Sequence, residues 1–286
     1  MDDPAFRSDL FRGTASYYDR FRVPYPQTLL DDLTRRSGAD GAGSLLDLAC
    51  GPGLIGFALH SRFREVWAVD QEPEMVDVAR QKAATADISA TFRFATSAAE
   101  DLSVPENSFD LIAIGNAFHR MQRENVAAHA LRWLRPGGHL ALLWGGSPWD
   151  GERQAPWQRA MAETVDRWRS RAQEQQEQQE PEQQKQQQDR IPAGYAENRK
   201  RRPDLDILRA AGFEPAGTYQ FPVSWEWTPD TLIGFAYSTS VLSREALGDL
   251  ASGFEEDLRH ELSACEPSGV LRQTIEFAYE LARRPV

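Results

Sequence analysis

Cysteine is scarce in this sequence. Cys50 and Cys265 are the only two among 286 residues, which is too few for a disulfide framework and indicates a reducing compartment. The N-terminal Met1–Pro4 is acidic and lacks the apolar segment of a signal peptide, and no apolar run approaches the length of a membrane span. We therefore expect a cytoplasmic protein that has no membrane partner.

Basic residues are fewer than acidic ones. The chain has 32 Lys and Arg against 43 Asp and Glu, a net charge of -11, whereas nucleic-acid binding favours a basic surface. We interpret the one basic run, Arg199–Arg202, as a solvated segment rather than an RNA site. The hydrophobic content of 41% is ordinary for a globular protein. The expected partner is a small molecule and not a nucleic acid.

One stretch organises the rest of the chain. Leu45–Ala49 is a short apolar run with one acid inside it, Gly51-Pro52-Gly53 is a tight turn, and apolar residues at helical spacing begin at Leu54. A second short strand, Val66–Asp70, also ends in an acid. A strand, a glycine turn and a helix, followed by a strand that ends in an acid, predict a site for a nucleotide-type cofactor.

The identity of that cofactor depends on Asp47. Gly51, Gly53 and Gly56 satisfy the G-x-G-x-x-G pattern, so a nicotinamide dinucleotide is an alternative. A buried acid beside the helix N-terminus would repel a pyrophosphate, whereas S-adenosylmethionine (SAM) carries a sulfonium and an amino group and no phosphate. Asp70 would hold the ribose hydroxyls in either case. A third interpretation makes Asp47 a turn or capping acid without a ligand.

Strands and helices alternate over residues 41–146. We expect strands at Ser44–Ala49, Val66–Asp70, Thr91–Ala95, Phe109–Gly115 and His139–Trp144, with helices near 54–63, 73–86 and 123–135. This alternation predicts an α/β protein with a parallel sheet covered by helices on both faces. Ligands of such sheets bind at the carboxyl ends of the strands, where Gly51, Asp70, Ala99 and Asn116 fall.

Four stretches, in order, resemble the motifs of a known family. They are Leu46–Gly53, Val69–Met75, Ala98–Leu102 followed by Ser108–Ile112, and Leu134–Leu140. The sequence resembles the class I SAM-dependent methyltransferases, and within them the small-molecule enzymes similar to the ubiquinone and trans-aconitate methyltransferases. The resemblance implies a Rossmann-like seven-stranded sheet, mostly parallel with an antiparallel last strand, and a helical cap. It also implies SAM as the cofactor and S-adenosylhomocysteine as the product.

The resemblance further implies roles for single residues. Tyr18 and Arg22 would approach the methionine end of SAM, Met75 would lie against the adenine, and Ala99 with Glu100 would contact its amino edge. The aromatics near Tyr18 could instead only fasten the first helix to the sheet, and Met75 could be a core residue. The family often has an acid where this chain has Ala98. The predicted cofactor-binding residues are Tyr18, Arg22, Asp47, Ala49, Gly51, Asp70, Gln71, Met75, Ala99, Glu100 and Asn116.

The chain divides into four predicted segments: N-terminal helices over the cofactor (1–40), the SAM-binding core (41–146), a cap helix with a low-complexity insertion (147–204), and the remaining strands with cap helices near 229–265 (205–286). The insertion, Gln173–Gln188, is expected to be exposed and without a catalytic role, with an interaction role as the alternative. Alternating residues predict strands near 219–227 and 274–281, the first at an edge because it contains Pro222.

His119 is the candidate general base, because imidazole accepts a proton near neutral pH and the residue follows a strand end. Asp166 is its candidate orienter; alternatively, His119 caps a helix or packs under the cap. No metal site is predicted.

Aromatic residues near the site predict an indole- or phenol-like acceptor, as in secondary metabolism, or else build the core of the cap. The alternatives are an NAD-dependent oxidoreductase, a carboxyl O-methyltransferase of a small acid, and a SAM-binding protein without catalysis. The predicted substrate contacts are Phe118, Trp144, Trp149 and Trp157.

Overall fold

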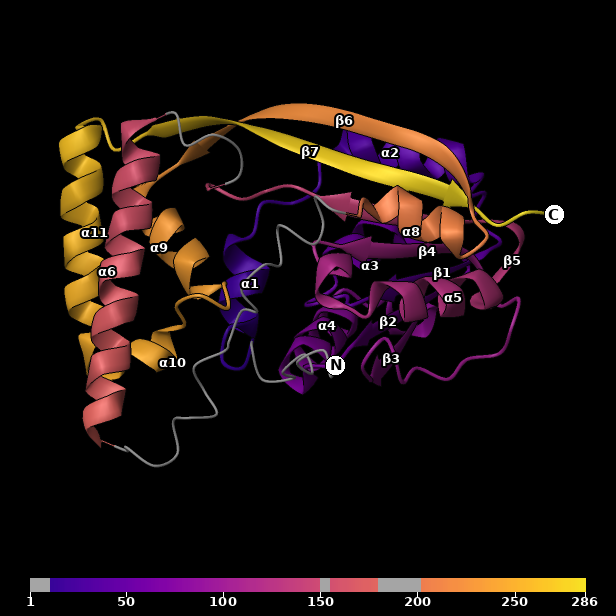
Figure 1. The fold of residues 1–286 in the computed structure, drawn as a ribbon, viewed down its shortest axis with the longest axis horizontal. Coiled ribbons are helices and arrows are strands. Elements are labelled where there is room, and N and C mark those ends of the chain that lie inside the picture. Colours follow the sequence, from indigo (N-terminus) through magenta and orange to yellow (C-terminus); the bar gives the residue numbers. More distant parts are fainter. Residues whose placement is uncertain (1–10, 150–154, 180–201) are drawn as a thin grey trace.

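The protein is built on one seven-stranded sheet. Figure 1 shows the fold in a computed structural model, which describes residues 11–149, 155–179 and 202–286. The strand order is β3-β2-β1-β4-β5-β7-β6, and β7 runs antiparallel to both of its neighbours. The predicted fold class is therefore confirmed. The strands are β1 (Ser44–Leu48), β2 (Glu65–Asp70), β3 (Phe92–Thr96), β4 (Phe109–Gly115), β5 (Leu134–Trp144), β6 (Glu214–Trp227) and β7 (Leu271–Arg283).

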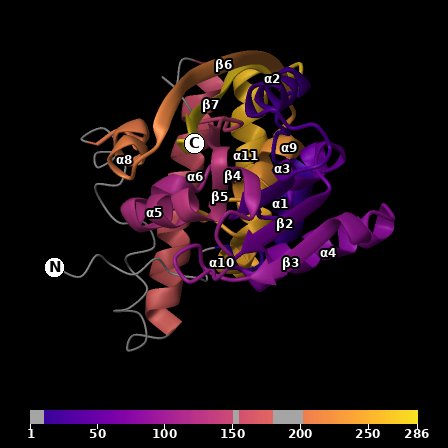
Figure 2. The same ribbon diagram turned by 90° about the vertical axis from the view of Figure 1, so that its right-hand side faces the viewer.

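Helices cover both faces of the sheet (Figure 2). Successive residues of a strand point to opposite faces, so Leu45 joins one hydrophobic core and Leu46 the other. Every residue of β1 is buried, as expected of a central parallel strand. The helices of the first face are α2 (Gln27–Ser37), α3 (Leu54–Leu59) and α4 (Pro73–Thr85), and those of the second are α5 (Arg123–Trp133) and α8 (Asp204–Ala210).

A layer of helices lies beyond one end of the sheet, with α6 and α11 packed side by side (Figure 1). The long antiparallel pair of strands β6 and β7 reaches into this layer, and α1 (Ala15–Phe21) lies between the layer and the sheet. Among the described residues, no helix has both the length and the apolar character needed to span a bilayer. The layer contains α6 (Pro156–Gln179), α9 (Pro229–Tyr237), α10 (Arg244–Leu247) and α11 (Ala251–Cys265); the short 3-10 turns are η1 (His60–Arg62), η2 (Ser89–Thr91), η3 (Phe118–Arg120) and η5 (Gly248–Leu250).

Most predicted strand bounds lie within a few residues of the observed ones, and β5 and β6 are the exceptions, because each begins five residues before its predicted start. The observed β5 begins at Leu134 and includes Pro136-Gly137-Gly138, residues that usually break a strand. Gly137 adopts a φ of +81° and donates its N–H to Arg284, and a bulge against β4 absorbs the irregularity. The predicted edge position of Pro222 is confirmed, because β6 is the outermost strand.

Two predicted segments lie partly outside the described residues. Of the Gln-rich stretch 173–188, residues up to Gln179 continue helix α6, and 180–188 are outside. Of the basic run, only Arg202 is described, and it forms an ion pair with Glu124 of α5.

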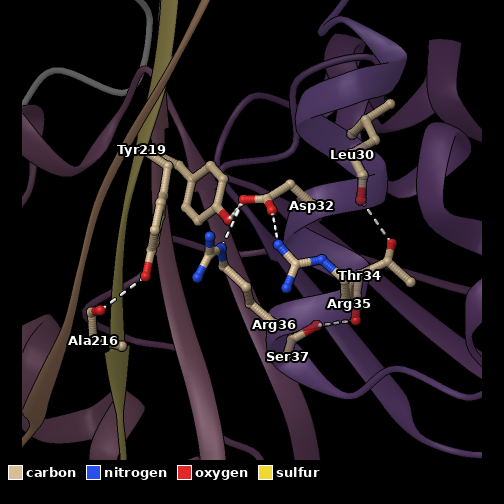
Figure 3. A network of polar contacts seen from close by, with 9 residues as sticks. Leu30, Asp32, Thr34, Arg35, Arg36, Ser37, Ala216 and Tyr219 are labelled. Atoms are coloured by element: carbon tan, nitrogen blue, oxygen red, sulfur yellow. Dashed lines mark hydrogen bonds and ion pairs between the residues drawn. The ribbon is translucent and has the colours of Figure 1, made fainter.

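A polar network fastens α2 to the last two strands. Asp32 accepts a hydrogen bond from the Tyr279 hydroxyl of β7 at 2.6 Å and others from Arg35 and Arg36, and the Arg36 guanidinium lies 3.7 Å from the centre of the Tyr219 ring (Figure 3). Burial raises the pKa of Asp32, but the hydrogen bonds from Tyr279 and the arginines lower it more, so that it lies below its usual value. The carboxylate is therefore charged at neutral pH.

The Tyr279→Phe variant should have a free energy of unfolding about 1–2 kcal/mol lower at pH 7, because Asp32 loses the hydrogen bond from the Tyr279 hydroxyl. A depressed pKa stabilises the fold above the unfolded value of Asp32 and loses that effect as the pH falls through the folded value, so the difference should shrink in acid. Urea denaturation at pH 7 and pH 3 measures both. Tyr219→Phe, whose hydroxyl donates to Ala216 at the surface, is the matched control; an equal loss there would contradict the account.

Candidate functional site

The turn after β1 requires its glycines. Gly51 and Gly53 have φ of +55° and +87°, and a Cβ on Gly53 would lie 2.5 Å from the Phe57 ring. A Cβ on Gly56 would lie 3.0 Å from Asp47 Oδ2, so its absence lets α3 approach β1 and donate the Gly56 N–H to that oxygen at 2.7 Å. The first free amides of a helix can bind an anion, and here a carboxyl group of the same chain takes one of them. This arrangement leaves less capacity for a pyrophosphate.

Asp70 is held at the carboxyl end of β2. Its Oδ2 accepts the Gly51 N–H at 2.8 Å and its Oδ1 accepts the Glu72 N–H at 2.9 Å. Burial raises the pKa of Asp70, and the hydrogen bonds from Glu72 and Gly51 oppose that rise. Two backbone amides thus fix the orientation of the carboxyl group, which retains further lone pairs for a ligand.

Two cavities open at this edge of the sheet. The larger encloses about 700 Å³, part of it open to solvent, and the smaller about 420 Å³. They adjoin, because Tyr18, Ala49, Gly115 and Asn116 line both. The other residues of the larger cavity are Phe11, Gly51, Asp70, Gln71, Met75, Ser97, Ala99, Glu100, Ala117, Arg120 and Met121; those of the smaller are Arg22, Val23, Tyr25, Asp47, Cys50, Leu54, Ile55, Gly145 and Gly146.

The boundary between the cavities has unusual backbone geometry. Ala49 and Asn116, which follow β1 and β4, have φ of +55° and +51°, a region that non-glycine residues seldom adopt. The Asn116 amide donates to Gly145 O at 3.1 Å and to the Tyr25 hydroxyl at 3.4 Å, and accepts the Gly145 N–H at 3.3 Å. Asn116 therefore joins the ends of β4 and β5 to the segment before α2. Backbone strain of this kind concentrates at functional sites.

Asp47 is the least satisfied polar group of the site. The residue is 1% exposed, and its Oδ1 has no hydrogen-bond partner in the part of the chain that the structure describes. Burial raises its pKa to about 8, with the Gly56 N–H opposing the rise and the charge of Asp70 adding to it. The sequence argument that a charged Asp47 repels a pyrophosphate is therefore corrected, because the free carboxyl group is mostly neutral at pH 7; it is the hydrogen bond to Gly56 that disfavours the pyrophosphate.

Arg22 connects the smaller cavity to the helical layer. Its Nε donates to Ser238 Oγ at 2.9 Å and an Nη donates to Ser238 O at 3.0 Å, at the C-terminus of α9. Its guanidinium lies between the rings of Tyr18 and Phe235, 4.4 and 4.6 Å from their centres. Arg22, a predicted cofactor contact, thus also fixes α1 against α9.

The structure brings the predicted cofactor-binding residues together. All eleven line one cavity or the other, nine of them the larger, with Arg22 and Asp47 in the smaller. Met75 is 2% exposed at the start of α4, so it serves the core as well as the cavity wall. These residues come from five separate stretches of sequence and meet at the carboxyl edge of the sheet, as the topology requires.

The predicted catalytic and substrate residues are not among those that line the cavities. His119 is half-buried on η3, between the lining residues Ala117 and Arg120. Asp166 is exposed on α6 and forms an ion pair with Arg169 at 3.2 Å. The four aromatics lie elsewhere: Phe118 and Trp157 are buried in the two cores, Trp149 packs edge-on against Phe235, and Trp144 pairs with β7 at the end of β5.

Sequence reasoning missed several residues that line the cavities. Phe11 precedes α1, which begins at Ala15, and lies at the larger cavity. Tyr25 lies between two prolines, Pro24 and Pro26, and lines the smaller cavity. Its hydrogen bond from Asn116, 91 residues away, is a tertiary contact that has no local signal. Arg120 and Met121 follow His119 directly, and only its position after a strand end could have indicated them.

Comparison with known proteins adds to this geometry. The sequence profile of the methyltransferase domain family matches residues 45–138, from β1 into β5. Residues 45–138 of this chain therefore match a methyltransferase domain. The predicted methyltransferase family is confirmed over these residues. An uncharacterized methyltransferase of Mycobacterium bovis is 31% identical over 157 residues, which cover 55% of this chain and 59% of the relative, so the match spans little more than half of that protein.

Two further matches set the limits of the comparison. The ubiquinone/menaquinone biosynthesis C-methyltransferase of Stutzerimonas stutzeri is 33% identical over 112 residues, 37% of this chain and 43% of that protein. The structure of the [4+2]-cyclase SpnF superposes with a TM-score of 0.53 at 20% identity, over 93% of this chain and 85% of that one. Because this fold also carries a cyclase, the methyltransferase domain's chemistry must be argued from its site.

The site fits SAM on its own geometry. Asp70 presents a carboxyl group held by two amides, the larger cavity is walled by Met75 and Ala99, and a buried carboxyl oxygen without a partner lines the smaller one. These groups suit two ribose hydroxyls, an apolar base and a cationic group respectively. The described residues contain no cluster of His, Cys, Asp and Glu arranged to hold a metal ion.

Proposed function

We propose that this protein transfers a methyl group from SAM to a small apolar molecule. The observation that carries the proposal is the pair of adjoining cavities, one with the carboxyl group of Asp70 and the other with Asp47 and Arg22. Asp70, Gln71, Met75, Ala99 and Glu100 would hold the nucleoside, and Tyr18, Arg22 and Asp47 the methionine part. SAM supplies an activated methyl group on a sulfonium ion.

The chain's own contribution is positioning and exclusion of water. Much of the rate of such a displacement comes from holding the two reactants in register in a dry site. Asn116 joins β4, β5 and the segment before α2 around the junction of the two cavities. Arg22 holds α1, which carries Tyr18 over both cavities, against the helical layer. These contacts would keep the geometry of the junction fixed.

An apolar and flat acceptor is favoured by the wall of the larger cavity. Phe11, Tyr18 and Met121 line it beside the residues assigned to the nucleoside. Aromatic and thioether side chains favour flat apolar ligands with few polar anchors. Phenols and indoles, as in secondary metabolism, remain the proposed acceptors, with these three residues as contacts in place of the four aromatics first predicted.

The decisive experiment combines cofactor binding with a turnover screen. Calorimetry should show saturable binding of SAM and S-adenosylhomocysteine and none of NADH. Labelled methyl transfer is then measured against indoles, phenols, amines and small carboxylates. Binding of NADH alone would refute the proposal in favour of an oxidoreductase, and SAM binding without turnover of any acceptor would favour a binding protein.

His119 remains the proposed general base for an acceptor that must lose a proton. With the acceptor that the screen identifies, His119→Ala should lower kcat about 100-fold and leave the affinity for SAM unchanged. His60→Ala is the matched control, since His60, on η1, is hydrogen-bonded to the carbonyl of Phe57 and is not among the residues that line either cavity. Equal turnover of the His119 variant and the wild type would remove this residue from the mechanism.

A further inference from the structure

The carboxyl group of Asp47 is buried without the contacts that a buried charge needs. Its Oδ2 accepts one hydrogen bond, from the Gly56 N–H at 2.7 Å, and its Oδ1 accepts none within the described residues. The residue lies in a central strand and is 1% exposed, yet it lines the smaller cavity. A buried charge is stable only when it is paired, and otherwise the group takes its neutral form.

The neighbouring Tyr25, Cys50 and Asp70 provide no positive charge that could pair with an ionised Asp47. Tyr25, before α2, and Cys50, in the glycine turn, both have pKa values well above their usual ones because they are buried, so they are neutral at physiological pH. Asp70, on β2, is an acid and raises the pKa of Asp47 further. The guanidinium of Arg22, after α1, lines the same cavity and is hydrogen-bonded to Ser238.

We propose that Asp47 selects the cofactor by its charge: the carboxyl group is protonated in the free protein and ionises when a cationic group of the cofactor enters the smaller cavity. This inference rests on the proposed function. The O–H bond of Asp47 breaks, the electron pair stays on the carboxylate, and the proton passes to the buffer. The cation then provides the partner that Oδ1 lacks, which compensates for the burial of the charge.

The pH dependence follows from linkage. The pKa of about 8 in the free protein means that Asp47 carries its proton at pH 6.5 and has lost most of it at pH 9. Ionisation of Asp47 should therefore contribute about one released proton to cofactor binding at pH 6.5 and close to none at pH 9. Its contribution to the SAM association constant should rise up to about tenfold per pH unit below pH 8 and level off above it.

The measurement is calorimetry of SAM binding in two buffers with different enthalpies of ionisation, at pH 6.5 and pH 9. Asp47→Asn is nearly isosteric and keeps an oxygen for the Gly56 N–H, but it has no proton to release. Because the amino group of SAM titrates equally with both proteins, the difference between them isolates Asp47. Asp77→Asn, which removes a surface partner of Arg80 on α4, is the matched control and should release the same number of protons as the wild type.

A second ligand separates the two cationic groups of SAM. S-adenosylhomocysteine retains the amino group and lacks the sulfonium. Release of about one proton with both ligands at pH 6.5 assigns the amino group as the partner of Asp47, and release with SAM alone assigns the sulfonium. Both results support charge selection.

Two results would overturn it. If the wild type releases the same number of protons on binding SAM at pH 6.5 and at pH 9, no group with a pKa near 8 is linked to binding. If the Asp47→Asn variant releases as many protons as the wild type, the proton does not come from Asp47. A thermal melt of the variant shows whether it folds, and the wild-type pH series tests the proposal even if it does not. If instead the proposed function is wrong, SAM will not bind to the wild type at all, which distinguishes that result from the two above.

Discussion

Asp70→Ala should bind SAM about 100-fold more weakly than the wild type. The carboxyl group is fixed at the end of β2 by the amides of Gly51 and Glu72 and lines the larger cavity. Hydrogen bonds to a charged group contribute about 1.5–3 kcal/mol each, so losing those to the ribose hydroxyls lowers affinity by about two orders of magnitude. Calorimetry at pH 7.5 measures the effect.

The Asp70 experiment needs a control for the shape of the turn. Alanine also releases the Gly51 and Glu72 amides, whereas Asp70→Asn keeps an oxygen acceptor and the side-chain volume. We expect the asparagine variant to fold like the wild type and to bind SAM with intermediate affinity. An alanine variant that melts at the wild-type temperature and retains wild-type affinity would show that the ribose is bound elsewhere.

Asp47→Asn should make the ligand-free protein more stable at pH 8 by about 2–4 kcal/mol. Folding raises the pKa of Asp47 from its ordinary 3.8 to about 8. A group with a raised pKa favours folding most below its unfolded value and loses that contribution as the pH rises through its folded value. The wild type is therefore penalised increasingly between pH 4 and pH 8, and asparagine, which cannot ionise, is not.

Thermal melts at pH 4 and pH 8 test this result. The variant should melt roughly 5–10 °C above the wild type at pH 8, with a difference near zero at pH 4. The side-chain amide donors of asparagine are buried beside Oδ1's former position, and this lowers the gain. A variant that is less stable than the wild type at both pH values would mean that Asp47 is charged in the folded free protein. The expected result is a loss of affinity together with a gain in stability, as is common at functional sites.

The sequence predicts the cofactor half of the molecule well because its signals are local. The glycines of the turn have dihedral angles or close approaches that only glycine allows, and the acid of Asp70 ends a strand that is recognisable from its own residues. Pro136-Gly137-Gly138 shows where local signals fail, because these residues would end an isolated strand. The hydrogen bond from Gly137 to Arg284, directly after β7, and a bulge beside β4 keep β5 continuous through them.

The acceptor side could not be predicted to the same degree. The stripe Trp157, Met161, Val165 and Trp168 correctly indicates a buried helix face, but it does not say which partner buries it. The partner is α11, to which Trp168 donates a hydrogen bond at Asp257, and not the cavity. The contact of Arg22 with Ser238 joins residues 216 positions apart, and no pattern in either segment indicates it.

The predicted cofactor contacts and the helical layer come from different parts of the chain. Every predicted nucleoside contact lies before residue 146, whereas the helical layer consists of α6, inserted between β5 and β6, and of α9–α11, inserted between β6 and β7. The second insertion leaves and rejoins the sheet at one end, because Trp227 pairs with Leu271, whereas the chain leaves β5 at Trp144 and enters β6 at Glu214, at the opposite end of the sheet (Figure 1). Mutations that reshape either insertion can therefore accumulate without altering the strands that present Asp47 and Asp70. Evolution can diversify the acceptors of such an enzyme while its methyl donor stays constant.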